Sequence, residues 1–377
     1  MKKERKVRDL GLDITRIIAF VSVPSVHFFL NSGFYDTPVL GEKMYIMVIF
    51  RTLFMICVPL FMLLSGYLMS TQKILMNKTN IVRQYKKLSK VIITYILATI
   101  LILIYRNFYL HEHLDLKNCI SNILGFNQYS WYVEMYIGFF LLIPFLNCLW
   151  HSIEKDGRTI LVLVTMALTT LPSILNIWDF GTPEALICPW ISTNYKAIVP
   201  DWWMMIYPIT YYYIGAYIKS YIDIKKLRTW KLFILSVCMV SVFGFFNIWR
   251  SYSIEFVWGA WCDWGGFQNV IDTVLIFLTI NSINYNKINK KIAGFLTLIS
   301  NLTFGAYILT WIPDNNNYPK LKELEPVMQS RFKYFPMIVG KTIVISLVLS
   351  LVIYVFVNVT KKFWFNLKNR KYNNKRI

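Results

Sequence analysis

Charged residues are scarce in this chain of 377 residues. Asp, Glu, Lys and Arg together make up 16 % of the chain, whereas hydrophobic residues make up 56 % and aromatic residues 17 %. A soluble protein of this length needs far more charge to cover its surface, and a disordered chain needs far fewer apolar residues. The composition therefore excludes both classes and is typical of a protein that crosses a membrane many times.

Residues that bind metals or form disulfides are also few, with six cysteines and four histidines. Neither a Cys-x-x-Cys nor a His-Glu-x-x-His pattern occurs, so we expect no protein-bound metal. Cys188 and Cys262 both fall in predicted outer loops and are the one pair that could form a disulfide there, although no compact cysteine spacing requires it.

Long apolar runs, by contrast, occur throughout the chain. Ten windows are long enough to cross a bilayer, some of them only with tilt. They cover residues 10–30, 44–69, 88–108, 131–150, 159–177, 202–222, 230–249, 267–284, 292–312 and 335–359. The sequence therefore predicts an all-α polytopic membrane protein of about ten helices, a single membrane domain without a fused soluble domain. It predicts loops at 178–201 and 313–334.

The net charge of +20 is distributed unevenly along the chain. With the N-terminus inside, the segments on the cytoplasmic side hold 28 of the 40 Lys and Arg residues. This asymmetry follows the positive-inside rule and places both termini in the cytoplasm. The basic excess thus indicates membrane topology and contact with anionic lipid, and we expect no nucleic-acid partner. The first apolar run lacks a signal-peptide cleavage site and is expected to remain as the first span.

Three ionisable residues lie within that first span: Asp13, Arg16 and His27. A charge at bilayer depth is costly unless it faces a protein interior or a wet cavity, so such residues indicate function. Arg16 and His27 are eleven residues apart, which places them on one helix face about 16 Å apart along the axis. A cation and an imidazole could therefore line one passage.

Other ionisable residues fall in the outer halves of predicted spans. Glu134 lies near the outer end of the fourth span, at the depth expected for His27, and a carboxylate there would orient an imidazole and raise its basicity. Arg51, Asp272 and Lys341 share this depth. We expect Asp272 to form an ion pair with Arg51 or Lys341, or these groups to line a polar vestibule that opens outward.

Clusters of basic and aromatic residues flank the spans. Arg83, Lys86, Lys87 and Lys90 either anchor the topology or form a collar for a phosphate-bearing ligand. Trp131 and Tyr132 suit the membrane interface. A further group, consisting of Trp258, Trp261 and Trp264, recurs at helical spacing. This spacing predicts a short helix that either stacks on sugar rings or lies in the interface.

Several short motifs follow one another in a fixed order. They are LDITRIIAFVSVPSVH with Asp13, Arg16, Ala19 and His27, VPLFMLLSGY with Ser65 and Gly66, WYVEMYIG with Trp131 and Glu134, YIGAYIK at 213–219 and LTFGAYIL at 302–309. Ser65 and Gly66 are small enough to let a neighbouring helix approach closely. In order and spacing, including an Arg-x10-His pair, these motifs resemble the acyltransferase 3 family of integral membrane acyltransferases, which modify surface polysaccharides, peptidoglycan and related glycans.

This resemblance implies about ten helices, a cytoplasmic acyl-CoA donor and an extracytoplasmic hydroxyl acceptor. Members of the family often have a histidine late in the ninth span, where this chain has Thr310 and Trp311, so a second histidine is not carried over. The implied protein lies in the cell membrane, by expectation a bacterial plasma membrane. Its expected partners are the lipid bilayer and a glycan acceptor, with a homodimer or polysaccharide-assembly partners as further options.

The mechanism we expect uses acetyl-CoA, or a similar short acyl-CoA, with its phosphates near Arg16 and Asp13 and the Arg83, Lys86 and Lys87 collar. His27 would act as general base or carry the acyl group transiently, and Glu134 would orient it. The acceptor would contact the outer residues Arg51, Trp131, Tyr132, Trp258, Trp261 and Asp272. Two other classes stay open: a transporter or flippase for a metabolite, amino acid or lipid-linked sugar, and an assembly subunit of a polysaccharide export system.

Overall fold

The structure, a computed structural model, describes residues 8–73, 76–127, 129–175 and 199–373, with side chains up to residue 360 except Asp201. These residues form helices and connecting turns, and within the described ranges the β-structure amounts to one isolated bridge between Val39 and Tyr252. The all-α prediction is therefore confirmed for the described part of the chain.

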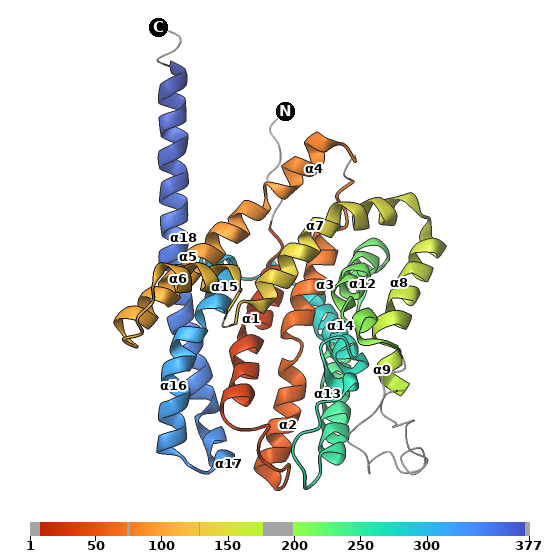
Figure 1. Cartoon of the computed structure of the whole chain (residues 1–377). Helices are drawn as coiled ribbons and strands as arrows, with labels where there is room; N and C mark the ends of the chain where they lie inside the picture. Colours follow the sequence, from red (N-terminus) through yellow and green to blue (C-terminus); the bar gives the residue numbers. More distant parts are fainter. Residues whose placement is uncertain (1–7, 74–75, 128, 176–198, 374–377) are drawn as a thin grey trace.

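The helices follow one another in a bundle whose members run mostly along one direction (Figure 1). They are α1 (Leu10–Asn31), α2 (Glu42–Phe54), α3 (Cys57–Met69), α4 (Lys78–Tyr85), α5 (Leu88–Phe108), α6 (Leu116–Leu124), α7 (Trp131–Ser152), α8 (Lys155–Thr169), α9 (Pro172–Leu175), α11 (Asp201–Met204), α12 (Tyr207–Tyr221), α13 (Thr229–Arg250), α14 (Phe267–Ser282), α15 (Lys290–Leu309), α16 (Trp311–Leu324), α17 (Met328–Arg331) and α18 (Phe335–Asn373), with the 3₁₀ turns η1 (Ile224–Lys226), η2 (Ala260–Cys262) and η3 (Phe332–Tyr334).

Eight helical segments among the described residues are long and apolar enough to cross a membrane, so the chain is a multi-pass membrane protein. They are Leu10–Asn31, Glu42–Met69, Lys78–Phe108, Trp131–Ser152, Lys155–Leu175, Thr229–Arg250, Lys290–Leu309 and Met328–Thr360. The two remaining predicted spans, 202–222 and 267–284, contain α12 and α14, which have 15 and 16 residues. A straight helix of that length falls short of a 30 Å hydrocarbon core, so a count of ten spans stays a prediction.

The region 313–334, predicted as a loop, is largely helical. It contains most of α16, and α17 and η3 follow. The prediction was wrong because α16 is polar, with the sequence WIPDNNNYPKLKEL, and an apolar window cannot detect it. The helix is held by packing instead, since Asp314, Asn317 and Tyr318 are buried.

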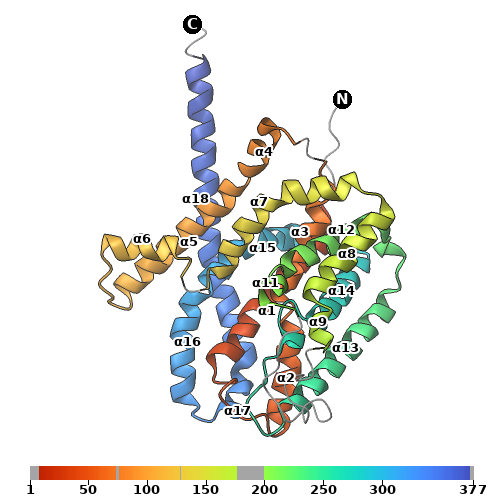
Figure 2. The ribbon, with the colours of Figure 1, turned by 45° about the vertical axis from the view of Figure 1, so that its right-hand side comes forward.

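The beginning of α1 and the end of α18 point toward the same end of the bundle. In Figure 1 the beginning of α1, the helix α4 and the end of α18 lie at the top, whereas α17 and the connection between α1 and α2 lie at the bottom. Figure 2, from another side, shows the same arrangement. The position of both termini on the cytoplasmic side of the membrane stays a prediction.

Helices α3 and α12 pack closely against each other. A Cβ atom on Gly66 would lie 2.0 Å from the carbonyl oxygen of Tyr212, and one on Gly215 would lie 2.2 Å from that of Leu63. Each glycine thus meets the backbone of the other helix, which only a residue without a side chain allows. The predicted close approach at Gly66 is confirmed.

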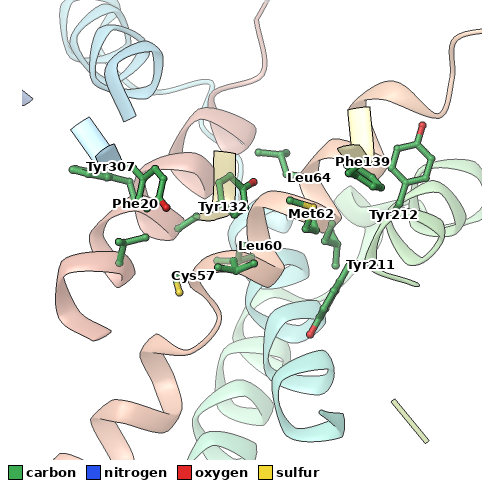
Figure 3. Packing of buried hydrophobic residues seen from close by; sticks show 14 of the residues in the cluster. Phe20, Cys57, Leu60, Met62, Leu64, Tyr132, Phe139, Tyr211, Tyr212 and Tyr307 are labelled. Carbon is green, nitrogen blue, oxygen red and sulfur yellow. The ribbon is translucent and has the colours of Figure 1, made fainter. Parts of the chain in front are cut away.

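The interior between these helices is rich in aromatic rings. Figure 3 shows Phe20, Tyr132 and Tyr307 near one another beside the α3 residues Leu60 and Leu64, and all five belong to one buried cluster. The rings of Tyr132 and Tyr307 meet edge to face, with centroids 5.7 Å apart. This cluster lies between the two sets of polar residues described next, and it brings α1, α3, α7 and α15 together.

Candidate active site

The imidazole of His27 is held by a carboxylate from the other end of the chain. His27 Nδ1 lies 3.1 Å from Asp314 Oδ2, and the Thr342 hydroxyl donates a hydrogen bond of 2.9 Å to Asp314 Oδ1. His27, Asp314 and Thr342 come from α1, α16 and α18 and are all buried. With Nδ1 engaged by the carboxylate, the tautomer that places a lone pair on Nε2 is favoured, which is the form a general base requires.

Tyr129 and Asn31 complete the surroundings of this imidazole. The Tyr129 ring lies over it, with centroids 3.9 Å apart. The Asn31 amide donates hydrogen bonds of 2.9 Å to the Tyr129 hydroxyl and to the His27 carbonyl oxygen. Burial raises the pKa of the Tyr129 phenol, and the nearby Asp314 charge raises it further. Tyr129 therefore stays neutral at physiological pH, and its ring covers one face of the imidazole.

Arg331 fixes the end of α1 that carries His27. Its guanidinium donates to the Ser32 carbonyl oxygen at 2.5 Å and to the carbonyl oxygens of Glu325 and Pro326, both at 2.7 Å. These three acceptors belong to the segment after α1 and the connection between α16 and α17. The arginine thus joins the two elements that supply His27 and Asp314, which preserves their relative position.

Glu134, expected to orient His27, has an exposed side chain at the start of α7. The carboxylate within hydrogen-bonding distance of the imidazole is Asp314 instead. Glu134 and Asp314 each lie in the first turn of their helix, α7 and α16, so position within a helix could not distinguish them. The predicted pairing of Glu134 with His27 is corrected to Asp314.

A second polar cluster surrounds Asp13 in the first turns of α1. The Asp13 carboxylate accepts hydrogen bonds from Arg8 at 2.6 and 2.8 Å and from Arg16 at 3.2 Å. Hydroxyls of α15 add to this set, with Ser300 at 2.7 Å and Thr297 at 3.0 Å. The structure thus brings the predicted Asp13 and Arg16 together and adds Arg8. Two guanidinium groups against one carboxylate leave excess positive charge at this end of α1.

Two cavities begin at Arg16. One of about 350 Å³ is bordered by Arg8, Asp13 and Asn301. The other, of about 430 Å³, lies between α3, α5, α7, α15 and α18, and its lining includes Lys90, Tyr132 and Tyr307. Both also border Ser300, so the polar entrance and the longer, mainly apolar cavity meet there.

The longer cavity ends short of His27. Tyr132 and Tyr307 line it, and the Tyr307 hydroxyl donates a hydrogen bond to the carbonyl oxygen of Tyr129, whose ring covers the imidazole. His27 does not border either of the two cavities that reach Arg16. The single passage predicted between Arg16 and His27 is therefore closed in this structure by three tyrosines.

The predicted basic collar divides into two parts. Lys90 borders the longer cavity together with Arg16. The side chains of Arg83, Lys86 and Lys87 are exposed, and Lys87 donates hydrogen bonds to Gln84 at 2.6 Å and to Gln72 at 3.4 Å. Of the four collar residues, only Lys90 borders this cavity. Lys90 lies within α5, and the first turns of α5 line the cavity.

Arg51 and Asp272 do not form the expected ion pair. Arg51 is fully buried, donates to the Tyr35 hydroxyl at 3.2 Å and to the Cys262 carbonyl oxygen at 3.1 Å, and lies over the rings of Phe256 and Trp258. Asp272 is also fully buried, and within the described residues neither carboxylate oxygen has a hydrogen-bond partner. The side chain of Lys341 is exposed. Two aromatic rings, the Tyr35 hydroxyl and the Cys262 carbonyl oxygen replace the acidic partner predicted for Arg51.

The predicted aromatic contacts to a sugar are only partly available. Trp131 is partly exposed and stacks on Trp264, whereas Tyr132 is buried. Trp258 is partly exposed and stacks on Tyr35, but Trp261 is fully buried and donates to Asn247. The predicted helix through Trp258, Trp261 and Trp264 is also wrong, since the helical part is only η2. Spacing of three residues occurs in such turns as well as in helices.

The predicted disulfide is not tested, and several residues of the site were not predicted. Cys188 lies outside the described residues, and Cys262 is a buried free cysteine. The residues that sequence reasoning missed are Arg8, Tyr129, Asp314 and Thr342. For Asp314 a signal existed: the run Asp314 to Asn317 follows an apolar span directly, where a polar residue next to a membrane helix indicates function.

The comparisons with known proteins give one match. The family model of acyltransferase 3, described as an acyltransferase domain, matches residues 9–357. No curated protein and no solved structure matches the chain. The matched range contains His27, Asp314 and Thr342 as well as Asp13 and Arg16.

Proposed function

Because this chain belongs to the acyltransferase 3 family and is therefore an acyltransferase, we propose that it transfers a short acyl group, in the first place acetyl, from acyl-CoA to a hydroxyl of an extracytoplasmic glycan. The observation that carries the proposal is the buried pair of His27 Nδ1 and Asp314 Oδ2, 3.1 Å apart. His27 lies near the end of α1 that is far from Arg8 and Arg16, and these two arginines border a cavity.

The pair of His27 and Asp314 supports the chemical step. His27 Nε2 accepts the proton of the acceptor hydroxyl while the oxygen attacks the thioester carbonyl carbon, and the carbonyl electrons move to its oxygen. When this intermediate collapses, the carbon–sulfur bond breaks and the imidazolium returns the proton to the CoA sulfur. Asp314 stabilises the imidazolium in between, and general catalysis of this kind contributes about 10²- to 10⁴-fold.

The cluster around Asp13 supports the binding of the donor. CoA carries several phosphate charges, and guanidinium groups bind phosphate through bidentate, charge-assisted hydrogen bonds. Arg8, Arg16 and Lys90 border the two connected cavities and can supply these contacts. The longer cavity, which is mainly apolar beyond Arg16, suits the pantetheine arm. Its end at Tyr132 and Tyr307 requires these rings to move before the thioester reaches His27.

The experiment that tests this function uses the purified full chain in lipid with radiolabelled acetyl-CoA and a cell-envelope glycan extract. We expect label in the glycan with the wild-type chain and none above background with His27→Ala. The matched control is His113→Ala, which removes an imidazole from the connection between α5 and α6, outside both polar clusters.

Two results would contradict the proposal. Glycan labelling by His27→Ala at the wild-type rate would remove His27 from the mechanism. No labelling by a folded wild-type chain, with acetyl-CoA or longer acyl-CoAs and a competent acceptor present, would exclude this donor and acceptor. Accumulation of an unmodified solute in vesicles would then favour the transporter alternative.

A further inference from the structure

Two polar side chains that follow Asp314 on α16 have polar atoms without a partner. Asn317 and Tyr318 are 3 % and 4 % exposed, and within the described residues neither Asn317 Nδ2 nor the Tyr318 hydroxyl has a hydrogen-bond partner. A buried donor that has lost water and gained nothing destabilises the folded state. Such groups occur where a ligand supplies the missing partner.

Both residues lie next to the pair of His27 and Asp314. They are three and four positions after Asp314, so all three side chains project from neighbouring positions on one side of α16. The Tyr318 ring meets the edge of the Phe28 ring, with centroids 6.2 Å apart, and Phe28 directly follows His27. Tyr318 thus contacts α1 next to the imidazole.

Tyr318 keeps its proton. Burial raises the pKa of the Tyr318 phenol well above its ordinary value, and the charge of Asp314, which contacts the imidazole, raises it further. A neutral phenol can both donate and accept a hydrogen bond, and the Asn317 amide nitrogen donates.

Asn317 and Tyr318 lie on the far side of the pair from the cavities. α15 begins near the start of α1, and α16 continues away from that end (Figure 1). Asn317 and Tyr318 are thus about one helical turn, or about 5 Å, farther from the Asp13 cluster than Asp314 is. A donor that enters at Arg16 reaches His27 from one side and leaves the other side to a second substrate.

We propose that Asn317 and Tyr318 form the subsite that binds the acyl acceptor, and that they recognise neutral hydroxyl groups of a sugar. This inference rests on the proposed function. Neither side chain is charged, so the subsite favours hydroxyls over carboxylates or phosphates. One acceptor hydroxyl donates its proton to His27 Nε2, and its neighbours accept from Asn317 and exchange a hydrogen bond with Tyr318. His27 is also enclosed, at 7 % exposure, so acceptor binding requires the surrounding helices to part.

The test measures acceptor and donor kinetics separately. Asn317→Ala and Tyr318→Phe are compared with the wild type in lipid, using radiolabelled acetyl-CoA and increasing concentrations of the glycan extract. The matched controls are Asn316→Ala, a half-buried neighbour on α16, and Tyr334→Phe in η3. We expect each test variant to raise the half-saturating glycan concentration about 3- to 10-fold, the effect of one lost neutral hydrogen bond. Half-saturation by acetyl-CoA, measured at saturating glycan, should stay within about twofold.

Protein stability separates this role from a structural one. The Tyr318 hydroxyl has no partner, so Tyr318→Phe should leave the thermal unfolding temperature unchanged or raise it. A lower unfolding temperature would overturn the subsite, as would an unchanged half-saturating glycan concentration, or a loss of turnover at saturating glycan only. Absence of label with the wild-type chain would instead overturn the proposed function, and the subsite with it.

Discussion

The contacts of Asp314 distinguish it from the other carboxylates that could have been the partner of His27. Several carboxylates lie near helix ends, but Asp314 combines full burial, a hydrogen bond from Thr342 and contact with an imidazole. Asp272 is as deeply buried and has neither contact among the described residues. One oxygen of the Asp314 carboxylate accepts a hydrogen bond from a hydroxyl, and the other contacts the imidazole. A carboxylate with these two contacts has the geometry that orients a general base.

Replacement of Asp314 by asparagine should lower the turnover of acyl transfer by about 10²- to 10⁴-fold. The amide keeps the size of the side chain but cannot stabilise the imidazolium and can hold the wrong tautomer. Initial rates at saturating acetyl-CoA measure the effect, and half-saturation by acetyl-CoA should change little. Glu134→Gln is the matched control, with activity near that of the wild type. The reverse pattern, an inactive Glu134→Gln and an active Asp314→Asn, would refute the assignment.

Cys262 should resist alkylation while the protein is folded. Burial raises the pKa of its thiol, and Arg51 offsets only part of the rise, so at pH 8 the thiolate that reacts with maleimides is less populated than in the unfolded chain. Since the folded pKa is the higher one, a pH above the ordinary thiol range favours unfolding. Mass spectrometry after N-ethylmaleimide treatment should find Cys262 modified only after denaturation. Modification at the rate of the half-buried Cys119 would contradict this.

At the level of helices, the contact of α3 with α12 depends on two glycines, Gly66 and Gly215, that have no side chain. Gly66→Ala and Gly215→Ala each place a methyl group against a backbone carbonyl that cannot turn away, so the helices must separate. We expect a loss of about 1–3 kcal/mol of stability for each, and a loss of activity at elevated temperature. Thermal unfolding in lipid measures it. Gly138→Ala, with no atom near its added Cβ, is the control.

The sequence predicted most helices but not the polar one. Apolar runs such as Leu10–Asn31 indicate a span by length alone, because a bilayer leaves the backbone few alternatives. α16 has no apolar stripe, and the burial of Asp314 and Tyr318 depends on α1 and α18, which are distant in sequence. The pairing of His27 with Asp314 joins residues 287 positions apart, so periodicity could place His27 but could not select its partner.

For the whole molecule, the two polar clusters define an axis along α1. Asp13 and Arg16 lie in its first turns, Arg8 lies just before it, and His27 lies near its other end. The aromatic residues Tyr129, Tyr132 and Tyr307 separate the clusters. This order would suit the proposed transfer, in which the two substrates reach the imidazole from opposite sides of the membrane and the aromatic residues separate the donor entrance from it.

The axis predicts unequal effects of two arginines on donor binding. Arg16→Ala should raise the half-saturating acetyl-CoA concentration about 10- to 100-fold, the effect of a lost charge-assisted hydrogen bond, with a smaller effect on turnover. Arg83→Ala should change it less than about twofold, since its side chain is exposed and borders neither cavity. Titration of acetyl-CoA in the labelling assay checks both. Equal effects of the two variants would show that the exposed collar binds the donor.

The Asp13 carboxylate also restricts which anions can bind in the cavity beside Arg8 and Arg16. Asp13 already accepts hydrogen bonds from both guanidinium groups. An arriving anion must therefore compete with a carboxylate that is part of the protein and loses no translational freedom when it binds the arginines. An ion with one phosphate gains little from that exchange. A molecule with several phosphates can draw Arg8, whose side chain is 46 % exposed, away from Asp13 and can also bind the N–H groups of Arg16 that do not contact Asp13. Only an anion with several phosphate groups should therefore compete with Asp13 for the two arginines. Inorganic phosphate at millimolar concentration should barely inhibit transfer.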